Sequence, residues 1–394
     1  MRILFENARL VTETGIEPGG WVFVQERRIA QVGYGRAPRL QDVERVDAEG
    51  RVLSPGMIDL HAHGALGRDT MDADPEGLRA MARFYARHGV TAYYATTMSA
   101  PIDEILAALA SVREVMNEAP DDSEVTEASL LGVHVEGPYI DPERAGAQSP
   151  GTIRRATLDE YERLVATGVV KLITLAPEYS ENRTLLPRAV ADGLVVAAGH
   201  SSASYDDMAQ AARLGLSQAT HLFNAMGGLH HREPGMVGAS LALDGIRCQL
   251  IADNIHIHPA VLKLAVRAKG INGIILITDA MSGTGMPDGT YRLGDQDVVV
   301  AGGEARLESG ALAGSTLTLE RAVHNMMAAA DLSLADALAM ATLVPARAMG
   351  IADHKGSIQP AKDADIILLD DAGVVWLTMV AGRVVYRRET TESA

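Results

Sequence analysis

The stretch Met57-Ile58-Asp59-Leu60-His61-Ala62-His63-Gly64 is an apolar run that ends in His-x-His and a glycine. Side chains at positions i and i+2 of a β-strand point to the same side. We therefore expect His61 and His63 to lie side by side at the end of a buried strand, facing one space. Two neutral imidazoles on one face suit a divalent transition metal, although two unrelated histidines near a strand end would give the same pattern.

Apolar strands alternate with amphipathic helices over the middle of the chain. Eight strand candidates are found at residues 56–61, 90–95, 130–135, 170–176, 194–198, 218–221, 247–252 and 274–278. The clearest helices between them are at residues 75–88, 102–118, 158–165, 185–192, 205–214 and 259–269. Eight such units over about 250–300 residues have the size of a (β/α)8 barrel, whereas a doubly wound open sheet would gather functional groups mainly at one crevice. We predict a barrel over residues 55–350, with an inserted hairpin near 288–313 and closing helices at 316–330 and 334–340.

Both ends of the chain have the pattern of short strands separated by turns. The N-terminal part, residues 1–54, has strand candidates at 2–5, 20–25, 28–32 and 43–47. The C-terminal part, residues 351–394, has them at 365–369, 374–380 and 383–386. We expect one small β-sandwich built from both termini, rather than two separate β caps, so the predicted fold class is α/β, a TIM barrel with this second domain.

Charge and cysteine content limit the partners and the compartment. The 394 residues carry a formal net charge of −16, which argues against nucleic acid or an anionic membrane as a main partner. No apolar run reaches the roughly 20 residues that cross a bilayer, and the N-terminus has no signal-peptide pattern. The only cysteine, Cys248, excludes an intrachain disulfide and fits a reducing cytoplasm.

Metal-ligand residue types follow five of the eight predicted strands. Because the carboxyl ends of barrel strands meet at one mouth, we expect these side chains to converge there. Unpaired, such a set would carry a heavy desolvation cost, which one metal ion, or two ions sharing a carboxylate, removes. Each residue could also have a structural role, as a buried hydrogen-bonded histidine or a turn-capping carboxylate. The set consists of His61, His63, Glu136, His200, His221 and Asp279.

This arrangement predicts hydrolysis by metal-activated water. A bound divalent ion lowers the pKa of its water, and a neighbouring carboxylate can take the proton and later pass it to a leaving group. Asp279, at the end of the last strand, is the candidate for that carboxylate. The chain has no serine nucleophile elbow, and Cys248 lies within a predicted strand. The site could act on an amide, an ester or a cyclic imine.

A second cluster indicates an anionic ligand. Arg232, in a histidine- and glycine-rich loop, and His256, after the seventh strand, offer donors suited to a phosphate. The alternative is an ordinary surface pair between Arg232 and Glu233. We favour a phosphate-bearing small molecule.

The chain resembles the N-acetylglucosamine-6-phosphate deacetylase family of the amidohydrolase superfamily. The resemblance runs from about residue 3 to residue 383. The matching motifs are PGMIDLHAHG at 55–64, VHVEGP at 133–138, GHS at 199–201, THLFNAM at 220–226, REPG at 232–235, IADNIH at 251–256, TDA at 278–280 and LAGS at 312–315.

The resemblance implies a fold, a cofactor and residue roles. The fold is a distorted (β/α)8 barrel with a small β-sandwich from both termini, and the expected assembly is a homodimer in which Arg232 and His256 act across the interface. The cofactor would be one or two divalent ions, Zn²⁺ first, with iron, manganese or cobalt as alternatives. The principal metal ligands would be Glu136, His200 and His221; the extra pair of two-metal members, His61 and His63; the catalytic aspartate, Asp279; and the substrate-binding positions, Asn224, Ala225, Arg232, His256, Leu312 and Ala313.

One position departs from the family pattern. Many relatives have a histidine in the loop after Glu-Gly-Pro that bonds the acyl oxygen of the substrate, and this chain has Gln148 there. An amide N–H can still donate, but it cannot carry a positive charge. Three explanations are open: Gln148 substitutes for the histidine, His230 or His231 reaches into the site, or the substrate differs.

Three other functions remain open at this point. A related N-acetyl hexosamine phosphate, such as N-acetylgalactosamine 6-phosphate, could be the substrate. Cyclic-amide hydrolases usually have a carboxylated lysine at the end of strand four, where this chain has Leu175-Ala176-Pro177 and Lys171 only at the start. A non-catalytic metal-holding protein would be expected to lose an essential ligand or the aspartate, and all are present.

Overall fold

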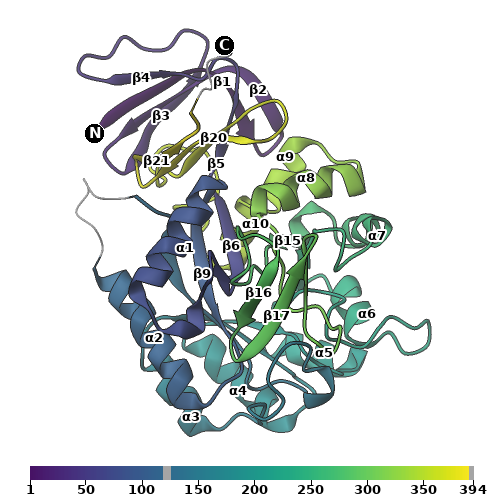
Figure 1. Ribbon diagram of the computed structural model, residues 1–394. Helices are drawn as coiled ribbons and strands as arrows, with labels where there is room; N and C mark the ends of the chain where they lie inside the picture. Colours follow the sequence, from purple (N-terminus) through teal and green to yellow (C-terminus); the bar gives the residue numbers. More distant parts are fainter. Residues whose placement is uncertain (119–125, 390–394) are drawn as a thin grey trace.

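The computed structural model describes residues 1–118 and 126–389 and contains the predicted barrel. Eight strands pair in parallel in the order β15-β14-β13-β12-β11-β10-β9-β6, and a parallel bridge between Ala62 and Ala280 links the first strand to the last (Figure 1). The strands are β6 (Met57–Ala62), β9 (Val90–Thr97), β10 (Ser129–Glu136), β11 (Val170–Leu175), β12 (Val195–Ala198), β13 (Gln218–Ala219), β14 (Arg247–Ile251) and β15 (Ile274–Ile277).

The barrel strands form because both of their faces are buried. Every residue of β6, β9 and β15 is buried, which matches their nearly continuous apolar sequences. The helices that follow the strands cover the outside of this sheet. They are α1 (Pro75–Arg87), α2 (Ile102–Asn117), α3 (Leu158–Val165), α4 (Ser180–Ala191), α5 (Tyr205–Arg213), α6 (Gly235–Ala242), α7 (Pro259–Lys269), α8 (Leu319–Ala330), α9 (Leu334–Ala339) and α10 (Leu343–Ala348).

Three helices differ from the expectation. α4 begins at Ser180, before the predicted start at residue 185, and contains Pro187 in its interior, a residue that usually ends a helix. α6 was not predicted, because it begins at Gly235 and also contains Gly238, and glycine is a poor helix former. α10 was also not predicted; it has only six residues.

Strands from both termini build one small domain, as predicted, and they all pair within a single sheet. β5 (Val52–Pro55) from the N-terminal part pairs antiparallel with β19 (Ile366–Leu369) from the C-terminal part. A buried apolar core lies within this small domain, which Figure 1 shows beside the barrel. Its other strands are β1 (Arg2–Thr12), β2 (Gly15–Gln25), β3 (Arg28–Tyr34), β4 (Glu44–Asp47), β20 (Val375–Val380) and β21 (Arg383–Arg387). Residues 390–394 of the predicted C-terminal part lie outside the described residues.

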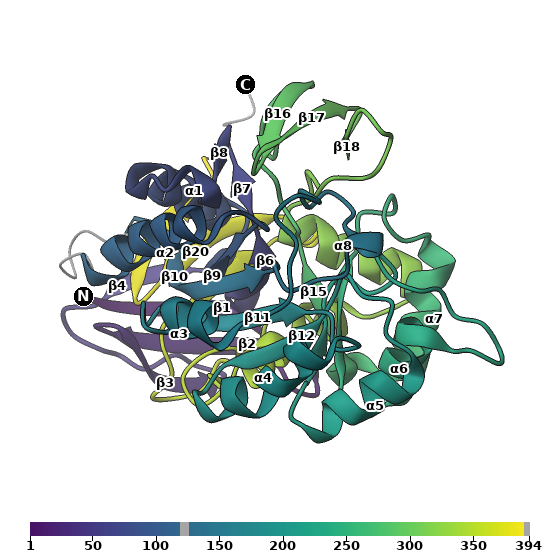
Figure 2. The same cartoon turned by 90° about the horizontal axis from the view of Figure 1, so that it is seen from below.

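The predicted insertion after the last barrel strand is a three-stranded antiparallel sheet. It consists of β16 (Gly289–Leu293), β17 (Gln296–Ala301) and β18 (Glu304–Arg306), and it projects from the barrel near the small hairpin of β7 (Gly64–Ala65) and β8 (Arg68–Asp69) (Figure 2). An apolar cluster that includes Met98, Met281 and Leu293 joins this sheet to the barrel mouth. The insertion therefore forms a wall beside the carboxyl ends of the strands. Among the described residues, none of the helices is both long enough and apolar enough to cross a membrane.

Candidate metal centre and its cavity

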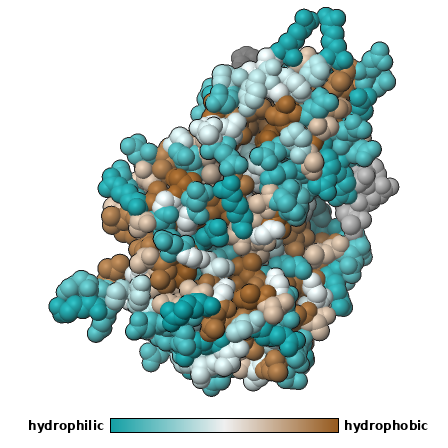
Figure 3. All heavy atoms as spheres, turned by 180° about the vertical axis from the view of Figure 1, so that it is seen from behind, coloured by the Kyte–Doolittle hydropathy of each residue, from teal (hydrophilic) through white to brown (hydrophobic). Residues whose placement is uncertain are grey.

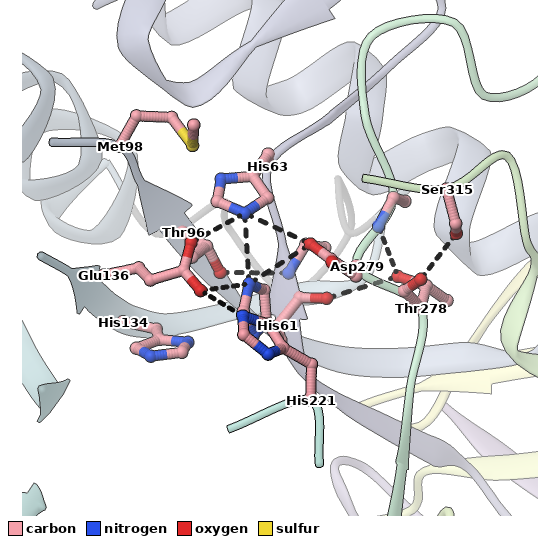
Figure 4. Close-up of polar contacts among 12 residues, drawn as sticks. His61, His63, Thr96, Met98, His134, Glu136, His221, Thr278, Asp279 and Ser315 are labelled. Atoms are coloured by element: carbon pink, nitrogen blue, oxygen red, sulfur yellow. Dashed lines mark hydrogen bonds and ion pairs between the residues drawn. The ribbon is translucent and has the colours of Figure 1, made fainter. Parts of the chain in front are cut away.

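Six of the predicted site residues come together at the carboxyl ends of the strands. They form two neighbouring groups, one of Glu136, His200 and His221 and the other of His61, His63 and Asp279. Figure 4 shows the carboxylates of Glu136 and Asp279 on opposite sides of the His61 and His63 imidazoles. All six side chains are buried.

The first group is centred on one oxygen of Glu136. Its Oε1 atom lies 3.0 Å from His221 Nε2 and 3.3 Å from His200 Nε2, and the two nitrogens are 3.0 Å apart. These three atoms are close enough to share one ion.

The second group is centred on Asp279. Its Oδ1 atom lies 3.3 Å from the Nε2 atoms of both His61 and His63, which are 3.0 Å from each other. The second oxygen of Glu136, Oε2, lies 3.4 Å from His63 Nε2. Glu136 Oε1 also lies 3.5 Å from His61 Nε2, so Glu136 contacts both groups, and its Oε1 atom reaches histidines of each.

Three of these residues follow strand ends in an unusual backbone conformation. His200, His221 and Asp279 have φ angles of 48°, 31° and 52°, in the left-handed region. This conformation costs an L-residue roughly 1–2 kcal/mol, and such strain is often kept at functional sites. The surrounding chain holds it in place: Asp279 N–H donates to His61 O over 2.9 Å, and Asp141 N–H donates to His200 O over 2.8 Å.

The hydrogen bonding of His200 supports a cation at the first group. Its Nδ1 atom lies 2.8 Å from the carbonyl oxygen of Arg144, which can only accept, so Nδ1 carries the proton. In the neutral ring Nε2 then has a lone pair, which faces the carboxylate oxygen of Glu136. Two electron-rich atoms at this distance repel each other unless a cation lies between them. The donor set of imidazole and carboxylate suits a divalent transition metal.

The pKa values of Asp279 and His63 are shifted by their contacts with oppositely charged neighbours. Burial alone would raise the pKa of Asp279, but the His61 and His63 imidazoles outweigh it and lower this pKa to about 2. Burial would lower the pKa of His63, yet hydrogen bonding to Asp279 and Glu136 raises it to about 10. Asp279 is therefore ionised at neutral pH and able to accept a proton.

Two buried residues next to the ligands were not assigned to the site from sequence. Asp59, two positions before His61 on the same strand, accepts the His61 backbone N–H over 3.2 Å. The i, i+2 spacing in the strand could have identified it. Thr278, immediately before Asp279, bonds to Asp59 over 2.6 Å. His134, two positions before Glu136 on β10, bonds Thr174 over 2.7 Å and packs edge-on against His61.

A cavity of about 310 Å³ opens over the two groups. Of the predicted substrate-binding residues, Gln148, Asn224, Ala225, His256 and Leu312 line it, together with Met98, Phe223 and Leu293, which were not predicted. Ala313 does not line the cavity; it is fully buried in the apolar cluster that joins the insertion to the barrel.

His256 is held at the cavity by a carboxylate. Its Nδ1 atom lies 2.6 Å from Asp253 Oδ2. Burial would raise the pKa of Asp253, but bonding to His256 lowers it below its ordinary value. The ionised Asp253 fixes the orientation of the His256 ring.

Arg232 lies away from this cavity. It is exposed in the loop between β13 and α6, which projects from the barrel in Figure 1 and is a hydrophilic projection in Figure 3. Its Nη1 atom lies 3.0 Å from His231 Nε2, and it lines an outer hollow with residues such as Ser202 and Glu233. Within one chain, Arg232 is thus not part of the cavity that contains His256.

Comparisons with known proteins identify the family of the chain. Residues 52–385 match the Amidohydrolase family. The chain is 37% identical over 386 residues to the N-acetylglucosamine-6-phosphate deacetylase of Bacillus subtilis (strain 168), covering 98% of this chain and 97% of that protein. It is 36% identical over 378 residues to an N-acetylgalactosamine-6-phosphate deacetylase of Escherichia coli O157:H7, covering 95% and 97%. A crystallised mutant of the Mycobacterium smegmatis N-acetyl-D-glucosamine-6-phosphate deacetylase, in complex with N-acetyl-D-glucosamine-6-phosphate, is similar with a TM-score of 0.89 and 30% identity, covering 98% and 99%.

Proposed function

The chain belongs to the amidohydrolase family, and we propose that it hydrolyses the acetamide of N-acetyl-D-glucosamine 6-phosphate to D-glucosamine 6-phosphate and acetate. One observation carries this proposal: Glu136, His200 and His221 present three donor atoms within 3.3 Å of one another, in the same cavity as the ionised Asp279. The single cysteine and the acidic charge support a place in the cytoplasm.

Two sets of residues would hold divalent ions. Glu136, His200 and His221 would hold the first, and His61 and His63, together with Glu136, would hold a second. Zn²⁺ is the first candidate, and iron, manganese or cobalt suit the same donors. Such an ion supplies a Lewis acid that polarises a carbonyl and makes water more acidic.

Asp279 would move the proton. Its carboxylate, ionised at neutral pH, takes a proton from the attacking water as the water oxygen bonds to the amide carbon. It then gives this proton to the sugar nitrogen as the C–N bond breaks, so that a neutral amine leaves. Asp279 is largely buried although it lines the cavity, which supports this role, because a site that excludes most water strengthens the interaction of the carboxylate with developing charge.

The residues that bind the phosphate would come from two chains. His256 lines the cavity and is oriented by Asp253, whereas Arg232 stands exposed on a projecting loop. We infer a homodimer in which Arg232 of one copy reaches the cavity of the other. A guanidinium at that position would bind a dianion that the overall charge of −16 otherwise repels.

Two alternative substrates differ in their support. N-acetylgalactosamine 6-phosphate is a second candidate, because one relative at 36% identity is named for that activity. A cyclic amide is disfavoured, because Lys171 lies at the start of β11, bonds to Gly168 O and is exposed.

A rate comparison tests the proposal. Purified protein, with its metal content measured, is supplied with the N-acetylated glucosamine and galactosamine 6-phosphates, the two sugars without phosphate, and dihydroorotate. We expect rapid acetate release only from a 6-phosphate, and faster release from the glucosamine compound. Equal rates without the phosphate, or turnover of dihydroorotate alone, would contradict the proposal.

A further inference from the structure

Gln148 holds a fixed orientation at the wall of the cavity. Its side chain is 3% exposed although it lines the cavity. Its Oε1 atom accepts the backbone N–H of Ser99 over 2.6 Å. Because a backbone N–H can only donate, the amide oxygen must face Ser99 and the amide nitrogen must face the other way.

The amide nitrogen is bonded to Glu136. Gln148 Nε2 donates to Glu136 Oε2 over 2.7 Å, and its remaining acceptor is the sulfur of Met98 at 3.6 Å. Both ends of the amide are therefore engaged. An N–H that bonds the acyl oxygen of a substrate would have to leave one of these partners first.

This bond fixes which carboxylate oxygen of Glu136 faces which histidines. Oε2, which Gln148 holds, lies 3.4 Å from His63 Nε2. Oε1 faces His200 and His221 and lies 3.5 Å from His61 Nε2. A carboxylate free to rotate about its last bond would lose this arrangement for part of the time. Two hydrogen bonds thus hold the carboxylate that both groups share. One joins Ser99, just after the second barrel strand, to Gln148, and the other joins Gln148 to Glu136.

We propose that Gln148 is a positioning residue that orients Glu136 for metal binding, rather than the group that bonds the acyl oxygen. The inference rests on the proposed metal site. Hydrogen-bond partners of metal ligands typically contribute about 10- to 100-fold in metal affinity, and Gln148 should contribute within this range.

Metal affinity, measured without any substrate, tests the role. Gln148→Met keeps the size of the side chain but has neither the donor nor the acceptor. Zn²⁺ affinity is determined by competition with a chromophoric chelator, and thermal unfolding of the metal-free proteins verifies that each variant folds. We expect Gln148→Met to bind Zn²⁺ about 10- to 100-fold more weakly than the wild type.

Two further variants sharpen the test. Met98→Leu removes the sulfur that contacts Gln148 but keeps the hydrogen bond between Gln148 and Glu136, so its Zn²⁺ affinity should match that of the wild type. Gln148→His offers one ring nitrogen to accept and one to donate, so it should recover part of the affinity. Unchanged affinity in Gln148→Met, with only kcat reduced, would overturn the inference in favour of a direct contact with substrate. Failure of the wild type to bind Zn²⁺ would instead contradict the proposed function.

Discussion

The Oδ2 atom of Asp59 accepts a hydrogen bond of 2.6 Å from the hydroxyl of Thr278, and this bond joins the first and last strands of the barrel directly below the site. The other carboxylate oxygen, Oδ1, lies 3.2 Å from His61 N and 3.3 Å from Thr278 N. The carboxylate of Asp59 therefore bonds to both backbone segments that carry His61 and Asp279, in addition to the direct bond from Asp279 N–H to His61 O.

Replacing Thr278 by valine should destabilise the protein because it leaves a buried carboxylate oxygen without its donor. We expect the free energy of unfolding of the metal-free protein to fall by roughly 1–3 kcal/mol. Thr278→Ser keeps the hydroxyl and should cost no more than about 1 kcal/mol. Urea unfolding at neutral pH measures both, and a serine variant as unstable as the valine variant would argue against this role of the bond.

The barrel and the convergence at its mouth could be predicted because they depend on local periodicity. The alternation of β6, continued one residue past its end, is enough to place His61 and His63 on one side, and their Nε2 atoms are 3.0 Å apart. The bond between Gln148 and Glu136 could not be predicted, because it depends on the path of the loop that follows Glu136 and on a backbone N–H at Ser99. Such contacts are set by tertiary packing, and residue spacing carries no signal for them.

Removing the histidine pair should change how many ions are bound. The variant His61→Ala/His63→Ala keeps Glu136, His200 and His221. We therefore expect the number of bound ions, measured by elemental analysis after metal loading, to fall from two per chain to about one. His200→Ala is the matched comparison, because it removes a donor of the other group. If the double variant still bound two ions, the second ion would have to lie elsewhere.

Replacing Asp279 by asparagine should separate proton transfer from metal binding. Asparagine cannot take a proton from water, so kcat should fall by about 10²–10⁴-fold. The donors Glu136, His200 and His221 are untouched, so metal content of the first group should be retained. The measurements are steady-state acetate release and elemental analysis of the same preparation. Wild-type turnover in this variant would exclude Asp279 as the proton carrier.

Asp69 should make stability depend on pH. Burial raises its pKa to about 6, although the His63 charge and the N–H groups of Met71 and Gly294 oppose the shift. A folded pKa above the unfolded value means that the folded state binds more protons, so the contribution of Asp69 is complete below about pH 4 and is lost as the pH rises through 6. As the pH rises from 5 to 7.5, the ionisation of Asp69 should thus lower the free energy of unfolding of the wild type by about 1–2 kcal/mol.

The variant Asp69→Asn isolates this effect. It cannot ionise, yet its side-chain oxygen can still accept the Met71 N–H, which lies 2.8 Å from Asp69 Oδ1. Urea unfolding of both proteins, metal-free, at the two pH values gives the difference. We expect the wild type to lose stability relative to the variant as the pH rises. Parallel pH profiles would mean that Asp69 titrates normally.

Mixing two impaired variants should restore activity at low substrate if Arg232 acts across a dimer. Arg232→Ala should raise the KM for the sugar phosphate and leave the metal content unchanged, since Arg232 lies outside the cavity of its own chain. In a mixed dimer with Asp279→Asn, the Arg232→Ala chain has an intact Asp279 and receives Arg232 from its partner. After subunit exchange, half of the dimers are mixed and each has one complete site, so the rate at low substrate should reach about a quarter of the wild-type rate. If Arg232 served only its own chain, neither site of the mixed dimer would be complete, and the mixture would be no more active than its components.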